Sequence, residues 1–256
     1  MFLNYKKQGG GNPIILLHGL FGSLRNLGVI SRAFCHSYQI YQFDLPNHGL
    51  SPRANSMDYL FQAAEVKKLI DLLNLQDCIV VGHSMGGKVA MMLALLYPSL
   101  VQKLVVLDIA PVAYSSHGHD EIIHALEASL TPALHSRAQV EQRLTPYIAE
   151  STIRQFLLSS LFTDTDGSMK WRFNLDAIKT YYADIAGWPL HNAAPFTQPT
   201  LFIKGQNSNY IKAEHKAAIA AQFPAATARI IANTGHWPHS EKPDSVNRFI
   251  QQFLTD

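Results

Sequence analysis

A β-branched run leads into a Gly-x-Ser-x-Gly motif in the stretch Ile79-Val80-Val81-Gly82-His83-Ser84-Met85-Gly86-Gly87-Lys88. A helix-forming run follows at residues 89–97 and stops at Pro98. This pattern predicts a strand, a sharp turn that carries Ser84, and a helix, because glycines beside the serine permit a strained backbone. Such a turn presents the hydroxyl at a helix N-terminus, where unpaired N–H groups stabilise negative charge. Ser84 is therefore a candidate nucleophile, and the alternative is an idle serine in a Gly-rich turn.

Apolar runs and helical patterns alternate on both sides of this stretch. Strands are expected at residues 2–8, 14–17, 38–43, 79–81, 103–107, 200–204 and 228–231. Helices are expected at residues 27–36, 57–73, 213–223 and 243–253. The alternation of strands with helices predicts the α/β class, with a doubly wound, mostly parallel sheet.

The alternation is interrupted between residues 111 and 195. This segment shows no convincing strand and has amphipathic patterns at residues 121–130, 137–144, 152–161 and 175–185. We interpret it as a helical lid inserted after the strand that ends at Asp108, over an α/β core of residues 1–110 and 196–256. The alternative is an ordinary continuation of the fold.

Composition argues for a globular protein with a small-molecule substrate. The chain has 256 residues, 47% of them hydrophobic, but only 16% charged residues and a net charge of +2. This balance argues against a nucleic-acid partner. Two cysteines, Cys35 and Cys78, indicate no disulfide framework, and no apolar run reaches the ~18 residues of a membrane span. We expect a cytoplasmic monomer or homodimer without a leader segment.

Cofactor and metal motifs are not found in the sequence. His117 and His119 do not have a reliable metal-ligand spacing. No Gly-rich phosphate loop or dinucleotide fingerprint occurs. We therefore expect a reaction that needs neither a metal nor a cofactor.

A serine nucleophile requires a general base, and His236 is the candidate. It lies in Asn233-Thr234-Gly235-His236-Trp237, directly after the last expected strand. In a parallel sheet this loop lies at the same edge as Ser84. Histidine suits the role because its pKa lies near neutrality. A loop histidine packed on Trp237 is the alternative, and His239 is a weaker candidate for the base.

The acid that orients the base is less obvious. In most folds of this type it follows the strand after the lid, but residues 204–210 contain no carboxylate and have Ser208 at the expected place. Asp108 ends the strand beside that of the nucleophile, and an aspartate in an apolar run is costly unless it has partners. We assign Asp108 as the acid, with Ser208 as a supplementary hydrogen-bonding partner. Alternatively, Asp108 only caps the end of its strand, and Ser208 is an ordinary serine in a turn. Glu214 is then the other candidate for the acid.

Backbone N–H groups are expected to stabilise the oxyanion. The turn places that of Met85, and the second donor comes from the loop after His18-Gly19. Leu20 is the preferred residue there, and Phe21 is the less favoured one. His18 is expected to hold this loop in place by hydrogen bonds.

With these residues identified, the chain resembles the serine-type α/β-hydrolase superfamily over nearly its whole length, and most closely the bacterial YbfF-type esterases. The stretches that carry the resemblance are His18-Gly19-Leu20-Phe21-Gly22-Ser23, Asn47-His48-Gly49-Leu50-Ser51-Pro52, Gly82-His83-Ser84-Met85-Gly86-Gly87-Lys88, Asp108-Ile109-Ala110-Pro111, Trp171-Arg172-Phe173-Asn174 and Gly235-His236-Trp237.

The resemblance implies esterase activity on short or medium acyl chains and on acyl-CoA thioesters. It also implies a set of four catalytic residues, which corresponds here to Ser84, Asp108, Ser208 and His236. The chain departs from the family at Pro46, where an arginine is common.

Trp171, Arg172 and Phe173 belong to one of the matching stretches and are expected to line the entrance for the acyl or CoA group. The alternative is that they pack within the lid, with Arg172 in solvent.

These residues predict acyl transfer to water. Ser84 attacks an ester or thioester, His236 acts as the base, and Asp108 orients it. Dehalogenases and epoxide hydrolases are disfavoured, because they use an aspartate at this turn. Two alternatives stay open: carbon–carbon chemistry on the same scaffold, as in lyase-like relatives of the menaquinone pathway, and a catalytically inactive binding module.

Overall fold

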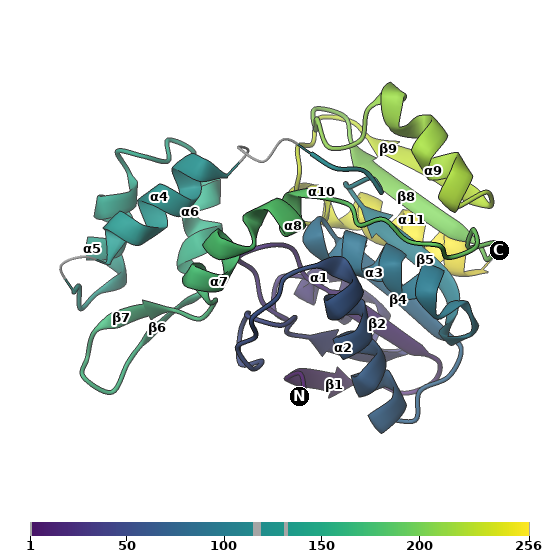
Figure 1. Ribbon diagram of the computed structural model, residues 1–256, viewed down its shortest axis with the longest axis horizontal. Coiled ribbons are helices and arrows are strands. Elements are labelled where there is room, and N and C mark those ends of the chain that lie inside the picture. Colours follow the sequence, from purple (N-terminus) through teal and green to yellow (C-terminus); the bar gives the residue numbers. More distant parts are fainter. Residues whose placement is uncertain (1, 115–118, 131–132, 256) are drawn as a thin grey trace.

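The computed structural model describes residues 2–114, 119–130 and 133–255. Within these ranges seven strands form one sheet in the order β1-β3-β2-β4-β5-β8-β9 (Figure 1). Neighbouring strands are parallel, except that β1 pairs with β3 in the antiparallel direction. The strands are β1 Tyr5–Gln8, β2 Pro13–Leu17, β3 Gln39–Phe43, β4 Cys78–His83, β5 Val101–Leu107, β8 Thr200–Gly205 and β9 Ala226–Ile231. The predicted α/β class with a mostly parallel sheet is confirmed.

Helices cover both faces of this sheet. One face carries α1 (Gly28–Phe34) and α11 (Pro243–Thr255), and the other carries α2 (Tyr59–Leu72), α3 (Met85–Leu96) and α9 (Lys216–Gln222) (Figure 1). Successive side chains of a strand point to opposite faces. In β2, Ile14 and Leu16 pack with α1 and α11, whereas Ile15 and Leu17 pack with α2 and α3. The apolar runs in the sequence are continuous because both faces of these strands are buried.

We call residues 111–195, between β5 and β8, the lid segment; its elements α4 to α7 lie to one side of the sheet (Figure 1). Its helices and strands are α4 Asp120–Ser129, α5 Arg137–Leu144, α6 Ser151–Leu158, β6 Leu161–Thr163, β7 Met169–Trp171, α7 Leu175–Thr180 and α8 Tyr182–Ala186. The expectation that this segment has no strand is wrong, because β6 and β7 form an antiparallel hairpin. Each strand has three residues, which is too short for a readable alternation of polar and apolar positions.

Buried hydrogen bonds connect the lid segment to the sheet and its helices. Tyr59 Oη on α2 donates to the carbonyl of Ile185 at 2.5 Å. Ser160 Oγ donates to the carbonyl of Phe21 at 2.7 Å, next to the candidate oxyanion loop. The lid segment therefore holds a defined position over the carboxyl ends of the strands. The division of the chain into a core domain and a lid domain stays a prediction.

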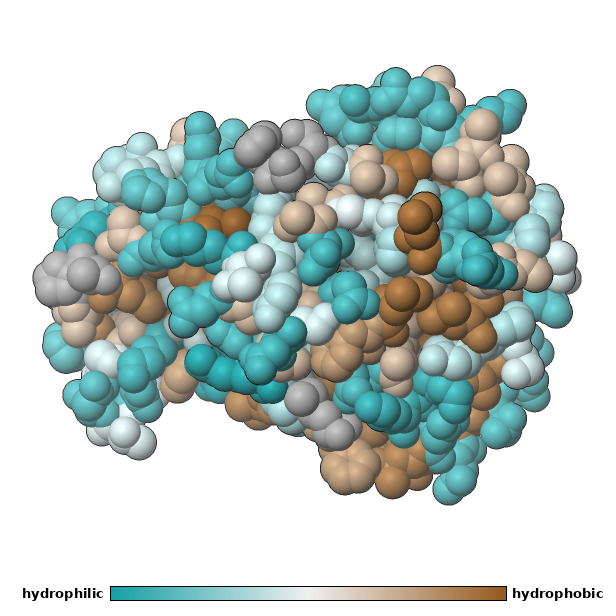
Figure 2. Space-filling model, in the orientation of Figure 1, coloured by the Kyte–Doolittle hydropathy of each residue, from teal (hydrophilic) through white to brown (hydrophobic). Residues whose placement is uncertain are grey.

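The surface in Figure 2 is mostly hydrophilic, with hydrophobic residues in small patches. Exposed large hydrophobic side chains include Leu60 and Leu72 of α2 and Leu190 of the lid segment. In the described part of the chain, no helix has both the length and the apolar character needed to cross a bilayer.

Candidate active site

Ser84 lies on the turn between β4 and α3 in a strained conformation, with φ 52° and ψ −121°. A Cβ on Gly82 would lie 2.2 Å from the carbonyl oxygen of Gly86. A Cβ on Gly86 would lie 2.3 Å from the carbonyl oxygen of Leu17 on β2. Both distances are far below van der Waals contact, so only glycine permits this close approach of β2, β4 and α3.

The side chain of His236 connects Ser84 to Asp108. His236 Nε2 lies 2.9 Å from Ser84 Oγ, and His236 Nδ1 lies 2.8 Å from Asp108 Oδ2. The two hydrogen bonds are compatible with one tautomer, in which Nδ1–H donates to the carboxylate and Nε2 accepts from the serine hydroxyl. The structure thus brings three residues from distant parts of the chain into one row of hydrogen bonds.

Asp108 is fully buried and has three hydrogen-bond donors around its carboxylate. Besides His236, the N–H of Gly205 donates to Oδ1 at 2.9 Å and Ser208 Oγ donates to Oδ2. These donors satisfy a charge that would otherwise be very costly to bury. Ser208 therefore lies where the sequence suggested, whereas Glu214 is 70% exposed and pairs with Lys212 on the surface.

Sequence reasoning missed two residues that hold the imidazole of His236. The ring of Tyr210 stacks on it, with centroids 3.9 Å apart and planes at 25°. His83 Nε2 donates to the carbonyl of His236 at 2.8 Å, and its ring lies 4.9 Å from the His236 ring. The position of His83 directly before Ser84 was the available signal, but its contact crosses 153 residues of chain.

The candidate oxyanion donors lie on either side of Ser84. Phe21 N–H donates to His48 Nε2 at 3.2 Å, so it is already engaged. For the N–H groups of Leu20 and Met85, no protein acceptor is found within the described residues. His18 Nε2 accepts from Leu45 N–H at 3.0 Å, which holds the loop that carries Leu20. This geometry favours Leu20 over Phe21 as the second donor beside Met85.

A family model described as the alpha/beta hydrolase fold matches residues 12–243. The chain belongs to the α/β-hydrolase fold family. Esterase YbfF of Escherichia coli K12 is 41% identical over 98% of this chain and 96% of its own length. The sn-1-specific diacylglycerol lipase ABHD11 of Mus musculus is 37% identical over 94% of this chain and 80% of its own length. A solved structure described as a marine microorganism esterase has a TM-score of 0.93 and 34% identity, over 98% of this chain and 99% of that one. The expected resemblance to YbfF-type esterases is confirmed.

Within the part of the chain that the structure describes, two cavities of this α/β hydrolase reach Ser84. The first, of about 500 Å³, we call the Lys88 cavity, and the second, of about 210 Å³, we call the Trp237 cavity. The Lys88 cavity is lined by Leu20, Tyr59, Ser84, Met85, Lys88, Ile109, Tyr114, His119, Tyr182, Ile185, Ala186, Asn209, Tyr210 and Lys212. The Trp237 cavity is lined by Gly19, Leu20, Phe21, His83, Ser84, His119, Ile122, Ile153, Phe156, Leu157, Tyr210, His236 and Trp237.

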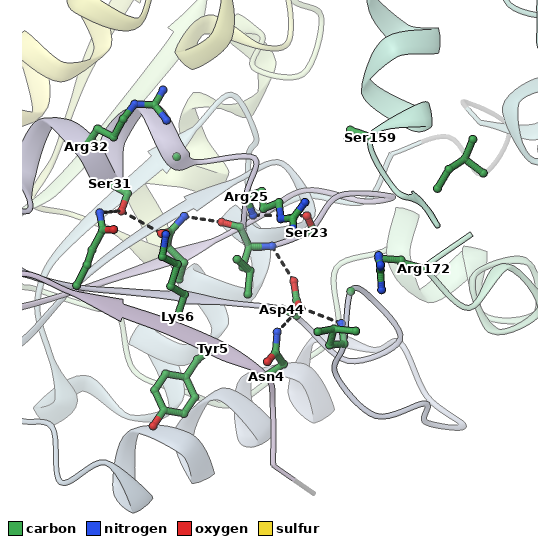
Figure 3. Close-up of a pocket in the computed structure, with 17 residues that line it drawn as sticks. Asn4, Tyr5, Lys6, Ser23, Arg25, Ser31, Arg32, Asp44, Ser159 and Arg172 are labelled. Atoms are coloured by element: carbon green, nitrogen blue, oxygen red, sulfur yellow. Dashed lines mark hydrogen bonds between the residues drawn. The ribbon is translucent and has the colours of Figure 1, made fainter. Parts of the chain in front are cut away.

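Trp171, Arg172 and Phe173 are not among the residues that line either cavity. Trp171 and Phe173 are buried in the lid segment, where their rings stack with centroids 5.3 Å apart. Arg172 directly follows β7 and lines a different cavity, of about 600 Å³, with Arg25 and Asp44 (Figure 3). The expectation that these residues line the substrate entrance is therefore corrected: the rings of Trp171, at the end of β7, and of Phe173 stack inside the lid segment, and Arg172 between them lines another cavity.

No group of three or more His, Cys, Asp or Glu side chains in the described residues is arranged to hold a metal ion. His119 lines both cavities and its Nδ1 lies 2.5 Å from Tyr182 Oη, whereas His117 lies outside the described residues. Cys35 and Cys78 are both free thiols.

Several histidines around the site are kept neutral by burial. Desolvation lowers the pKa of His48 and of His239 from 6.5 to about 3, and lowers that of His119 to about 4. Burial also lowers the pKa of His83, and the neighbouring His239 and His236 lower it further. A neutral His83 and a neutral His239 leave His236 without an adjacent positive charge that would oppose its protonation during catalysis.

These shifts predict that acid unfolds the protein. A histidine with a lowered pKa binds fewer protons in the folded state than in the unfolded state. Its contribution to the free energy of unfolding is therefore fully present above about pH 6.5 and is lost as the pH falls toward 3. Each such histidine should contribute about 1.4 kcal/mol per pH unit within that window. Urea denaturation between pH 7 and pH 5 measures this slope. The variant His239→Gln should reduce this slope by about the contribution of one histidine. His124→Gln changes an exposed histidine and should leave the slope unaltered. An unchanged slope in His239→Gln contradicts the prediction.

Proposed function

We propose that this α/β hydrolase cleaves carboxylic esters, and also acyl-CoA thioesters, through an acyl-enzyme on Ser84. The observation that carries the proposal is the row of hydrogen bonds from Ser84 Oγ through His236 to Asp108. The names of the YbfF esterase and of the marine esterase, which share more than a third of their residues with this chain, support ester hydrolysis.

In the acylation step, Ser84 Oγ attacks the carbonyl carbon while its proton moves to His236 Nε2. The buried carboxylate of Asp108 stabilises the imidazolium that forms and keeps Nδ1–H directed toward itself. The N–H groups of Met85 and Leu20 stabilise the oxyanion, and the start of α3 adds its positive dipole end. The carbon–oxygen or carbon–sulfur bond then breaks, and His236 gives its proton to the departing group.

In the deacylation step, water takes the place of the leaving group. His236 Nε2 accepts a proton from that water, which attacks the acyl carbon, and Ser84 Oγ leaves with the proton returned by His236. A thioester can react through the same two steps, because a thiol is an easier leaving group than an alcohol. Besides water, the chemistry requires no metal or cofactor.

The leaving group must lie on the side of His236, because this residue protonates it. His236 lines the Trp237 cavity and, among the residues the structure describes, not the Lys88 cavity. We therefore place the alcohol or thiol part of the substrate in the Trp237 cavity, against apolar side chains such as Phe156 and Leu157. The acyl part then enters the Lys88 cavity.

A panel of nitrophenyl esters and acyl-CoA thioesters of graded chain length tests the proposal. We expect hydrolysis of esters and of acyl-CoA, and covalent labelling of Ser84 by a fluorophosphonate, located by mass spectrometry. Folded protein that hydrolyses neither class and resists the fluorophosphonate would overturn the assignment. Hydrolysis of esters without acyl-CoA would overturn only its thioester part.

A further inference from the structure

A lysine is buried beside the nucleophile, and the mechanism does not use it. Lys88 lies in the first turn of α3, about 6 Å along the helix axis from Ser84, and only 1% of its surface is exposed. Lys88 is among the residues that line the Lys88 cavity. It donates to the last carbonyls of α8, those of Ala186 at 3.1 Å and Gly187 at 2.6 Å.

The charge of Lys88 has no counter-ion within the described residues. Its hydrogen-bond partners are neutral carbonyls, and its remaining close contacts are the rings of Tyr114 and Tyr59, with centroids 4.7 Å and 5.2 Å from Nζ. Burial lowers the pKa of this lysine to about 7. An ammonium group has three N–H donors, so one N–H is free after the two hydrogen bonds to the carbonyls are made. Such a group is costly to bury and would be stabilised by an incoming anion.

The rest of the Lys88 cavity also favours an anion. A second lysine, Lys212, lies in its wall, and no Asp or Glu is among its described lining residues. The hydroxyls of the two tyrosines beside the Lys88 ammonium group are already engaged, since Tyr59 donates to Ile185 O and Tyr114 donates to Tyr210 O. Lys88 is therefore the group in this cavity that lacks a partner of opposite charge. The Trp237 cavity differs, because the described residues that line it include no lysine and its lid wall is apolar apart from His119.

We propose that this hydrolase selects acyl groups that end in a carboxylate, so that its substrates are monoesters or monothioesters of dicarboxylic acids, with Lys88 as the specificity-determining residue. The inference rests on the proposed function, which places the acyl group in the Lys88 cavity. The substrate carboxylate accepts the free N–H of Lys88 and supplies its counter-ion. Lys212 contributes a weaker attraction from the exposed rim, where solvent screens its charge.

Two esters with matched acyl chains test the proposal. Monoethyl adipate and ethyl hexanoate have acyl groups of the same carbon number and the same leaving group, but only the first ends in a carboxylate. The measured quantity is the ratio of their kcat/KM values, which cancels any general loss of active protein. We expect wild-type protein to favour the adipate ester by about 10-fold or more, the size of a charge-assisted hydrogen bond.

Lys88→Met should lower that ratio on the order of 10- to 100-fold, and Lys212→Met should change it far less. Lys88→Gln retains a donor for the carbonyls of α8 without the charge, and it serves the same purpose if the methionine variant does not fold. A wild-type preference for hexanoate overturns the inference. An equal loss on both esters in the Lys88 variants also overturns it, because Lys88 would then only hold α8. Failure of wild-type protein on both esters and on the nitrophenyl panel would instead reject the proposed function itself.

Discussion

Ser84→Ala is expected to lower kcat for ester hydrolysis by about 10⁶-fold, the loss typical when the nucleophile of such a set is removed. The reason is chemical: the hydroxyl that forms the acyl-enzyme is absent, and His236 Nε2 loses the group to which it is hydrogen-bonded. The measurement is hydrolysis of a nitrophenyl ester by purified variant and wild-type protein.

The fold should survive this substitution. Ser84 is only partly buried, and its side chain makes its hydrogen bond to His236 rather than to the scaffold. The thermal midpoint should therefore stay within a few degrees of wild type. Ser240→Ala removes an exposed hydroxyl on α10 (Pro238–Glu241) and should retain full activity as a matched control. A Ser84→Ala protein with activity close to that of the control would refute the nucleophile.

Asp108→Asn is expected to lower kcat by about 10⁴-fold with little change in KM. The amide has almost the same shape, but its NH₂ group cannot accept the Nδ1–H of His236 as Asp108 Oδ2 does. The imidazole would then favour the tautomer with a proton on Nε2, which cannot accept the serine proton. KM should be preserved because Asp108 is fully buried behind His236 and does not touch the substrate.

Two further variants distinguish Asp108 from other acids. Glu214→Gln changes an exposed carboxylate and should leave kcat unaltered. Ser208→Ala removes one of three donors to Asp108 and should cause a smaller loss than Asp108→Asn, since Gly205 N–H and His236 still hold the carboxylate. A large loss of kcat in Glu214→Gln, together with an active Asp108→Asn variant, would instead make Glu214 the acid that orients His236.

Local sequence predicted the turn at Ser84 because its requirements are local. A β-branched strand, flanking glycines and a helix-forming run specify a strained strand-to-helix turn within about ten residues. The position of His236 could be inferred because the carboxyl ends of parallel strands share one edge, so topology alone brings its loop near Ser84. The unusual position of the acid at Asp108 could be inferred for a similar reason. The loop that usually carries the acid contains Ser208 and no carboxylate, and the neighbouring strand ends in one. Catalytic roles for all four residues stay predictions until the variants are measured.

The remaining features depend on contacts between segments far apart in the chain. The sequence around Trp171 and Phe173 does not show whether these side chains line a substrate cavity or pack inside the lid. In the structure they stack inside the lid, at the end of the hairpin of β6 and β7. Tyr210 could be recognised only once its ring was seen stacked on His236. Lys88 reads as an ordinary polar residue in the first turn of a helix, yet α8, almost a hundred residues later, covers it and makes it a buried cation. The alternation of strands with helices and the nucleophile turn thus follow from short-range propensity and hydrophobic pattern. The order of the strands, the shape of the cavities and the burial of the Lys88 charge follow from how distant segments pack together, because burial depends on every segment that meets at a point.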